Sequence, residues 1–280
     1  MQRISTARRV SQIFLWFAPL IFWPLLIFAF RKTTSHSYLF GGAALAAIMF
    51  IAAWVLGANA VKRKSGEQKW VSLAGLLLIA PVMTVSLFAG LGPPPQEPEK
   101  WLATAVDEEI RYRLLLFAGL FAASGFVVLR ECVRQAGERI YSALGSAAII
   151  VSTALFVLYI TNDGTVLEAL RYRVASGKMP DWYAPIKSHF IIVGFVEVAL
   201  TYLATAAFAT ALRIVGLLGK TGCRIFQGLS LLAVLSIVLS QLFPGRLLTP
   251  AFVLGIPAVP FLMPYFIGVN LLRRAGDSAA

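Results

Sequence analysis

The sequence predicts an all-α membrane protein, with one polytopic bundle of about eight transmembrane helices over residues 1–280. Hydrophobic residues make up 59% of the chain and charged residues 14%, with a mean hydropathy of +0.78, whereas about 25% of a soluble domain is charged. Apolar stretches recur at close to the ~20 residues that a helix needs to cross a bilayer. They cover residues 11–30, 38–61, 71–92, 114–129, 140–161, 190–212, 225–243 and 251–272.

The net charge of +12 indicates an orientation rather than a nucleic-acid partner. If the N-terminus is cytoplasmic, the cytoplasmic segments carry 15 of the 25 basic residues, and positive charge favours that side. We therefore expect both termini inside, in a bacterial-type inner membrane. The basic residues form short clusters at span ends instead of one continuous patch, which argues against nucleic-acid binding.

Two parts of the chain need an interpretation beyond a count of spans: the start of the first span and the segment before the fourth. Arg8 and Arg9 precede the first span, but no small-residue cleavage site follows, so we expect a retained anchor rather than a signal peptide. Three prolines at 93–95 end the third span. A helix is expected to resume near Trp101 and to extend the short apolar stretch at 114–129 into a longer helix.

The second outer loop is expected to hold a short amphipathic helix over 165–175, lying at the membrane interface. Residues 166–173 repeat the pattern of 106–113, Val-x-Glu-x-(Ile or Leu)-Arg-Tyr-Arg. One interpretation is a coincidence of ordinary helix-surface residues. The other is an outer vestibule that attracts an anionic small molecule or lipid headgroup, through four arginines, Arg111, Arg113, Arg171 and Arg173.

Glu197 is the charged residue that lies well inside an apolar span. A carboxylate at bilayer depth costs ~2.5–3.5 kcal/mol on insertion scales, so its side chain should face the bundle. It is a candidate proton or cation site, with Tyr202 on the same span. The alternative is a neutral glutamate that only hydrogen-bonds a neighbouring helix.

The last span contains Pro257, Pro260 and Pro264. An internal proline removes a helix hydrogen bond and clashes with the preceding turn. Broken helices line substrate sites in many transporters, so these prolines are candidate substrate-site positions. The alternative is a kinked helix that serves packing alone.

Cofactor chemistry finds little support in the sequence. Cys132 and Cys223 are predicted at cytoplasmic helix ends, where a disulfide is not expected. His36 and His189 lie outside the spans, so paired haem ligands on facing helices are not expected. No nucleotide, zinc-hydrolase or serine-hydrolase signature is present, and we expect neither a metal nor a cofactor.

The run Glu108-Glu109-Ile-Arg-Tyr-Arg113 resembles the EExxxR motif of the CAAX-processing and bacteriocin-processing membrane proteases, which are also polytopic. The resemblance implies a membrane hydrolase in which Glu108 and Glu109 activate water with histidines on later helices. It covers about nine residues of the chain. The chain departs from the family where histidines belong, since the nearest matches are Phe156 followed by Tyr159 and Ile160, and Phe266 followed by Asn270.

Three functions follow from these patterns. The first is a transporter, permease or membrane subunit of a transport complex that uses Glu197 and the broken last span. The second is a non-catalytic membrane scaffold or accessory subunit, in contact with a membrane-protein partner or a second copy. The third is a divergent membrane hydrolase. In all three, the protein is embedded in the lipid bilayer.

Overall fold

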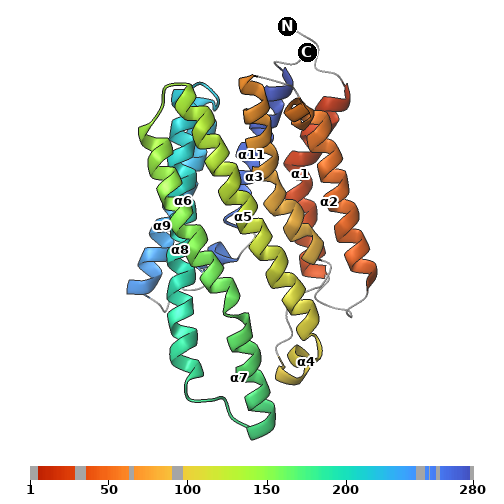
Figure 1. The fold of residues 1–280 in the computed structure, drawn as a ribbon, viewed down its shortest axis with the longest axis vertical. Helices are drawn as coiled ribbons and strands as arrows, with labels where there is room; N and C mark the ends of the chain where they lie inside the picture. The colour runs from red at the N-terminus through yellow and green to blue at the C-terminus, as the bar shows by residue number, and fades with distance from the viewer. Residues whose placement is uncertain are drawn as a thin grey trace.

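The computed structural model describes residues 6–28, 36–62, 66–89, 97–243, 250–251, 253–256 and 259–277, and these form helices and turns without a strand among them (Figure 1). Apolar stretches in lipid must satisfy their backbone hydrogen bonds internally, which favours helices. The helices are α1 (Thr6–Phe28), α2 (His36–Leu56), the 3-10 helix η2 (Ala58–Lys62), α3 (Glu67–Ala89), α4 (Pro98–Ala103), α5 (Ala105–Gln135), α6 (Ile140–Thr161), α7 (Asp163–Ser176), α8 (Tyr183–Ile214), α9 (Lys220–Leu242) and α11 (Leu262–Asp277).

The long helices run roughly along one axis, in two groups joined by α5 (Figure 1). On one side α11 packs on α3, and α1 packs on α2. On the other side α8 lies between α6 and α9, and α5 contacts both α3 and α6. Two buried apolar clusters correspond to these groups, one centred on α1, α2 and α3 and the other on α8 and α9.

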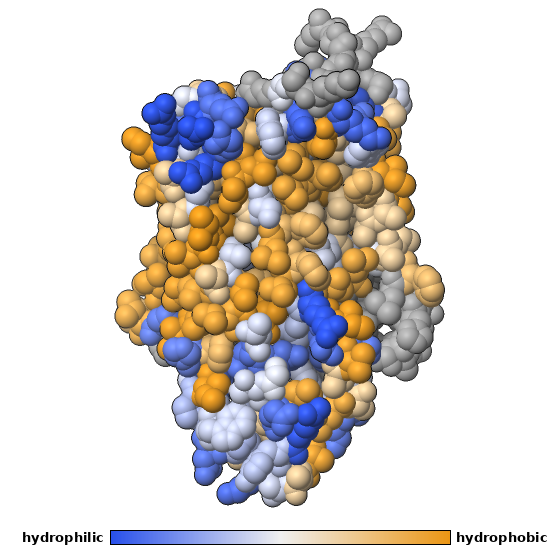
Figure 2. All heavy atoms as spheres, viewed as in Figure 1, coloured by the Kyte–Doolittle hydropathy of each residue, from blue (hydrophilic) through white to orange (hydrophobic). Residues whose placement is uncertain are grey.

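Five helices in the described chain are long and apolar enough to cross a membrane. They are 68–87 within α3, α5, the continuous stretch 140–176, α8 and α9. On the face shown in Figure 2, a broad apolar band crosses the middle of the molecule and polar side chains gather toward both ends. These features support a membrane-embedded helical protein.

Most helices begin before the apolar stretches that predict them. The helix expected around 114–129 is α5, which runs from Ala105 to Gln135. The helix expected over 165–175 lies within α7, but the loop expected before it is helical. Asn162 joins α6 to α7 in a helical conformation (φ −68°, ψ −9°), so α7 continues α6 toward the polar end of the molecule (Figures 1 and 2). Its interfacial position stays a prediction.

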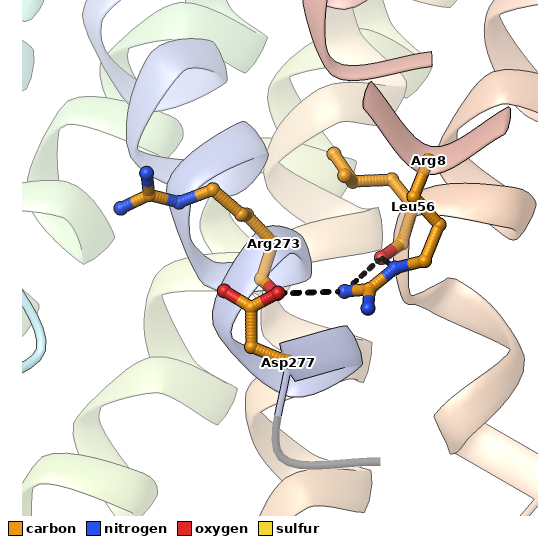
Figure 3. A network of polar contacts seen from close by, with 4 residues as sticks. All are labelled: Arg8, Leu56, Arg273 and Asp277. Carbon is orange, nitrogen blue, oxygen red and sulfur yellow. Dashed lines mark hydrogen bonds and ion pairs between the residues drawn. The ribbon is translucent and has the colours of Figure 1, made fainter. Parts of the chain in front are cut away.

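The first and last described helices meet at one end of the bundle. The Arg8 guanidinium of α1 donates to the Leu56 carbonyl at 3.4 Å, to the Arg273 carbonyl at 3.2 Å and to Asp277 at 3.1 Å (Figure 3). A side chain at Gly57 would overlap the Leu272 carbonyl oxygen, so this glycine lets α11 approach the end of α2. These contacts hold the start of α1 and the end of α11 at the same end of the bundle.

Candidate functional site

Glu197 lies near the middle of α8, 14 residues after its first residue and 17 before its last. Helical rise places it ~21 Å from the start of the helix. It is buried, with an exposed fraction of 7%. Helix α8 packs on α6 along the face that carries this carboxylate, as the sequence predicts for a charged group at that depth.

Three polar side chains from two helices form the centre of the site. Ser152 of α6 donates to Glu197 Oε1 at 3.2 Å, and Thr201, one turn further along α8, donates to the same oxygen at 3.1 Å. The Ser152 and Thr201 hydroxyls are themselves 2.6 Å apart. No Lys, Arg or His in the described chain forms an ion pair with Glu197. The carboxylate is therefore held by neutral donors.

A cavity of about 70 Å³ lies beside the Glu197 side chain. Its walls come from α6, from α8 and from the segment that precedes α11, through Phe156, Tyr159, Gly194, Pro260 and Phe261. A water molecule needs roughly 10–15 Å³ of such space and polar partners. The cavity therefore has room for a few water molecules, with the carboxylate as a polar partner.

A second space of about 10 Å³ touches Glu197 from the side of α5 and also borders Ser152 and Thr201. Phe156 and Phe261 line both spaces, and their rings meet edge to face with centroids 6.2 Å apart. Gly119 of α5 makes room for this pair, because a Cβ at that position would press against the Phe156 ring. The aromatic pair and Glu197 therefore border both spaces.

The last apolar stretch is interrupted in the way the prolines predict. Residues 253–255 are helical, Ile256 and 259–261 form bends and turns, and α11 begins at Leu262. Pro260 lies in the break, whereas Pro264 lies in the first turn of α11, where a missing N–H costs nothing. Pro257 lies outside the described residues.

Tyr202 bonds the segment at the helix break rather than the Glu197 carboxylate. Its hydroxyl donates to the Leu254 carbonyl at 3.1 Å, in the last helical residues before the interruption. Carbonyls freed by a helix break at membrane depth need such partners. The structure therefore places Glu197 and Tyr202 on α8 against two neighbouring parts of the same broken segment.

The four arginines expected at the outer vestibule lie on α5 and α7, and three of them are ion-paired. Arg111 bonds Glu108 at 3.0 Å in a buried pair, Arg113 bonds Glu109, and Arg171 bonds Glu168. Arg173 is exposed near the end of α7. The positive charge of three candidates is thus locally compensated by a glutamate one turn away.

The positions that the protease resemblance singles out are spread through the molecule. Glu108 is buried, whereas the Glu109 side chain is 56% exposed. Tyr159 lines the Glu197 cavity. Asn270 donates to the Phe266 carbonyl within α11, which runs toward the end opposite α4 and α7 (Figure 1).

Ser152 and Phe261 are site residues that the sequence analysis does not single out, and Phe156 enters it only through the protease resemblance. One signal was present, since the buried face of α6 carries four small residues, Ser142, Gly145, Ser146 and Ser152. Such stripes mark close helix contacts in membranes. The stripe indicates a packed face but not that its last serine meets a carboxylate.

Metal ligands do not cluster in the described part of the chain, where no three or more His, Cys, Asp and Glu side chains are grouped to hold an ion. The thiols of Cys132 and Cys223 are free and buried. Comparison of the chain with models of protein families, with curated proteins and with solved structures finds no match.

Proposed function

We propose that this chain is a membrane transport protein, or the membrane subunit of a transport complex, in which Glu197 is the proton- or cation-binding group. One observation carries the proposal: a carboxylate at mid-helix, held only by hydroxyl groups, borders a cavity next to a broken helix. Intramembrane carboxylates in contact with a wet cavity are typical of ion and proton pathways.

The proposed architecture has eight crossings with both termini cytoplasmic, in a bacterial-type inner membrane. Support comes from Arg8 and Asp277, which hold the first and last helices at one end, as an even number of crossings requires. The same end carries Arg130, Arg134 and Arg139 near the turn between α5 and α6. A surplus of basic residues favours the cytoplasmic side.

The chemistry of the site fits reversible binding of a small cation. Ser152 and Thr201 can donate to a charged carboxylate, and they can accept from a protonated one. Neither form is locked by a fixed positive charge. A proton or a monovalent cation arriving through the cavity would remove the charge that is costly at this depth.

Movement of the broken segment offers a route to alternate exposure. Phe261 belongs to this segment and contacts Phe156 of α6, and both rings border the two spaces around Glu197. A shift of Phe261 would join or separate those spaces. Broken helices beside a fixed site serve this purpose in secondary transporters.

Proton flux tests the proposal. The purified full-length chain is reconstituted into liposomes that contain a pH-sensitive dye, and proton entry is driven by a potassium diffusion potential. We expect faster entry than in protein-free liposomes, and we expect Glu197→Gln to remove the excess. Glu131→Gln is the matched control, because Glu131 is exposed on α5 and bonds Arg134. Equal flux through the wild type and Glu197→Gln contradicts the proposal.

A non-catalytic membrane subunit is the second candidate. It rests on the hydrogen bonds that join α6 to α8 at Glu197. Ser152 donates to both the backbone oxygen and the carboxylate of Glu197, as a packing interaction would require. This candidate predicts that Glu197→Gln changes stability without changing flux. Co-purification of a stoichiometric membrane partner would favour it.

A further inference from the structure

A groove of about 680 Å³ lies on the side of the bundle between α9 and α11. Its walls are apolar and include Ile225, Leu229 and Leu232 of α9 and Met263 and Phe266 of α11. The volume is typical of small-molecule sites, which occupy about 300–1,000 Å³. The groove is separate from the Glu197 cavity, whose walls come from α6, α8 and the broken segment.

The groove exists because α9 packs chiefly on α8 and little on α11. The two walls meet at its floor, where the Ser230 hydroxyl lies 3.6 Å from the Met263 sulfur. Tyr202 also lines the floor. At the rim, Trp16 of α1 stacks on Phe266 with ring centroids 4.9 Å apart. Leu229 and Leu232 are more than half exposed, so the groove is open toward the apolar surroundings of the bundle.

Arg273 stands at the polar end of this groove. Phe266, Asn270 and Arg273 follow at spacings of four and three and therefore share one face of α11, and the first two line the groove. The Arg273 side chain extends away from Arg8 and Asp277 (Figure 3). Its Nε atom is buried and has no hydrogen-bond partner among the residues that the structure describes.

The α9 and α11 walls of the groove carry no acidic residue, and the next acidic residue along α11, Asp277, is ion-paired with Arg8. Residues 198–276, which include its α9 and α11 walls, contain no Asp or Glu. The basic residues of this stretch at the same end of the bundle as Arg273 are Arg213, Lys220, Arg224 and Arg274. An apolar groove that ends at the Arg273 guanidinium is complementary to a molecule with an apolar tail and an anionic head.

We propose that the groove binds an anionic membrane phospholipid, with an acyl chain along α9 and α11 and the phosphate at Arg273. Guanidinium groups bind phosphate through paired, charge-assisted hydrogen bonds. Basic pockets between helices on the cytoplasmic side bind anionic lipid headgroups, and this end is the one that carries the basic surplus. The groove shares no lining residue with the Glu197 cavity, but Tyr202, Leu254 and Val259 bring it against the broken segment. The lipid proposal does not rest on the proposed transport activity.

Lipid titration of the delipidated full-length protein in detergent, followed by native mass spectrometry, tests the proposal. The probes are dioleoyl phosphatidylglycerol and dioleoyl phosphatidylcholine, which share acyl chains and differ in headgroup charge. We expect one site that prefers the anionic lipid by about tenfold. Arg273→Gln should remove that preference, and Leu232→Trp, which fills the groove, should weaken the binding of both lipids.

Two control variants are matched to these changes. Arg224→Gln removes the same charge at the same end, from the side of α9 away from the groove. Leu231→Trp introduces the same bulk one residue away, at a side chain of similar exposure (55% against 59% for Leu232) that does not line the groove. Both controls should bind the lipids as the wild type does.

Three results would overturn the proposal. Arg273→Gln and Arg224→Gln could act equally, which would indicate general surface charge rather than a site. The two lipids could bind equally well to the wild type. The groove could prove to be filled by a second copy of the chain, in which case Leu232→Trp, and not Leu231→Trp, would break a dimer that forms without lipid.

Discussion

Glu108 and Glu197 are both buried carboxylates, with exposed fractions of 2% and 7%, but the bundle holds them in different ways. Glu108, near the start of α5, is ion-paired with Arg111 one turn away. Glu197, in the middle of α8, receives hydrogen bonds from Ser152 and Thr201. One charge is balanced by a fixed cation, and the other is surrounded by neutral donors.

The difference separates a structural carboxylate from one that can exchange its charge. A buried ion pair is costly to break because the remaining partner is left uncompensated. Hydroxyl groups reorient to suit either protonation state. The cavity beside Glu197 adds room for water next to the carboxylate. The comparison therefore predicts a structural role for Glu108 and supports the proposal that Glu197 binds an ion, and each role can be tested by substitution.

The largest effect is expected from breaking the buried ion pair. Arg111→Met leaves Glu108 without its cation and should lower the free energy of unfolding by about 3–5 kcal/mol. Reversible unfolding in mixed detergent measures the change. Glu108→Gln combined with Arg111→Met should recover more than half of the loss. A single substitution that costs less than about 1 kcal/mol would show that the pair is not structural.

An intermediate effect is expected at Glu197. Glu197→Ala removes the carboxylate oxygen that the Ser152 and Thr201 hydroxyls share as an acceptor and should cost about 1–3 kcal/mol. Glu197→Gln keeps an oxygen acceptor and should cost less than about 1 kcal/mol. The same unfolding assay applies. If Glu197→Gln were as damaging as Arg111→Met, the two carboxylates would be equally structural and the contrast would fail.

A smaller change in stability, with a clear change in access, is expected at the aromatic pair. Phe261→Leu shortens the ring that meets Phe156 and should cost about 1–2 kcal/mol. It should also join the two spaces around Glu197 and raise the rate at which a carboxyl reagent reaches it severalfold. Val253→Leu, at an exposed position before the break, is the control. An unchanged rate in Phe261→Leu would show that the ring does not limit access.

The smallest effect is expected from the exposed ion pair beside Glu108. Arg113 and Glu109 are both more than half exposed, and such pairs contribute little because water and salt screen them. Arg113→Gln should change the free energy of unfolding by less than about 0.5 kcal/mol. A loss close to that of Arg111→Met would mean that burial does not explain the difference between neighbouring pairs.

Hydropathy predicted most of the helices because each must bury an apolar length against lipid or protein. It also placed Glu197 inside the bundle, since a charged side chain that faces the lipid core is costly. The continuity of α6 and α7 was not predicted, because Asn162, Asp163 and Gly164 are residues that usually interrupt a helix. Here Asn162 keeps a helical backbone conformation.

The hydrogen-bond partners of Glu197 could not be predicted from the sequence, for a physical reason. Ser152 meets the carboxylate only at a particular rotation and register of α6 against α8, and neither is set by a hydrophobic pattern. The groove beside α9 has the same origin, because it depends on how far α9 stands from α11. Local periodicity predicts elements, whereas sites between elements depend on their packing.

Carbodiimide labelling of the wild-type protein tests the central claim most directly. Dicyclohexylcarbodiimide is apolar, enters membranes and reacts with protonated carboxyl groups, and mass-spectrometric mapping identifies the glutamates that it modifies. The account predicts that Glu197 is modified and that the ion-paired Glu108 is not. Modification of Glu108 with Glu197 left unmodified would contradict it.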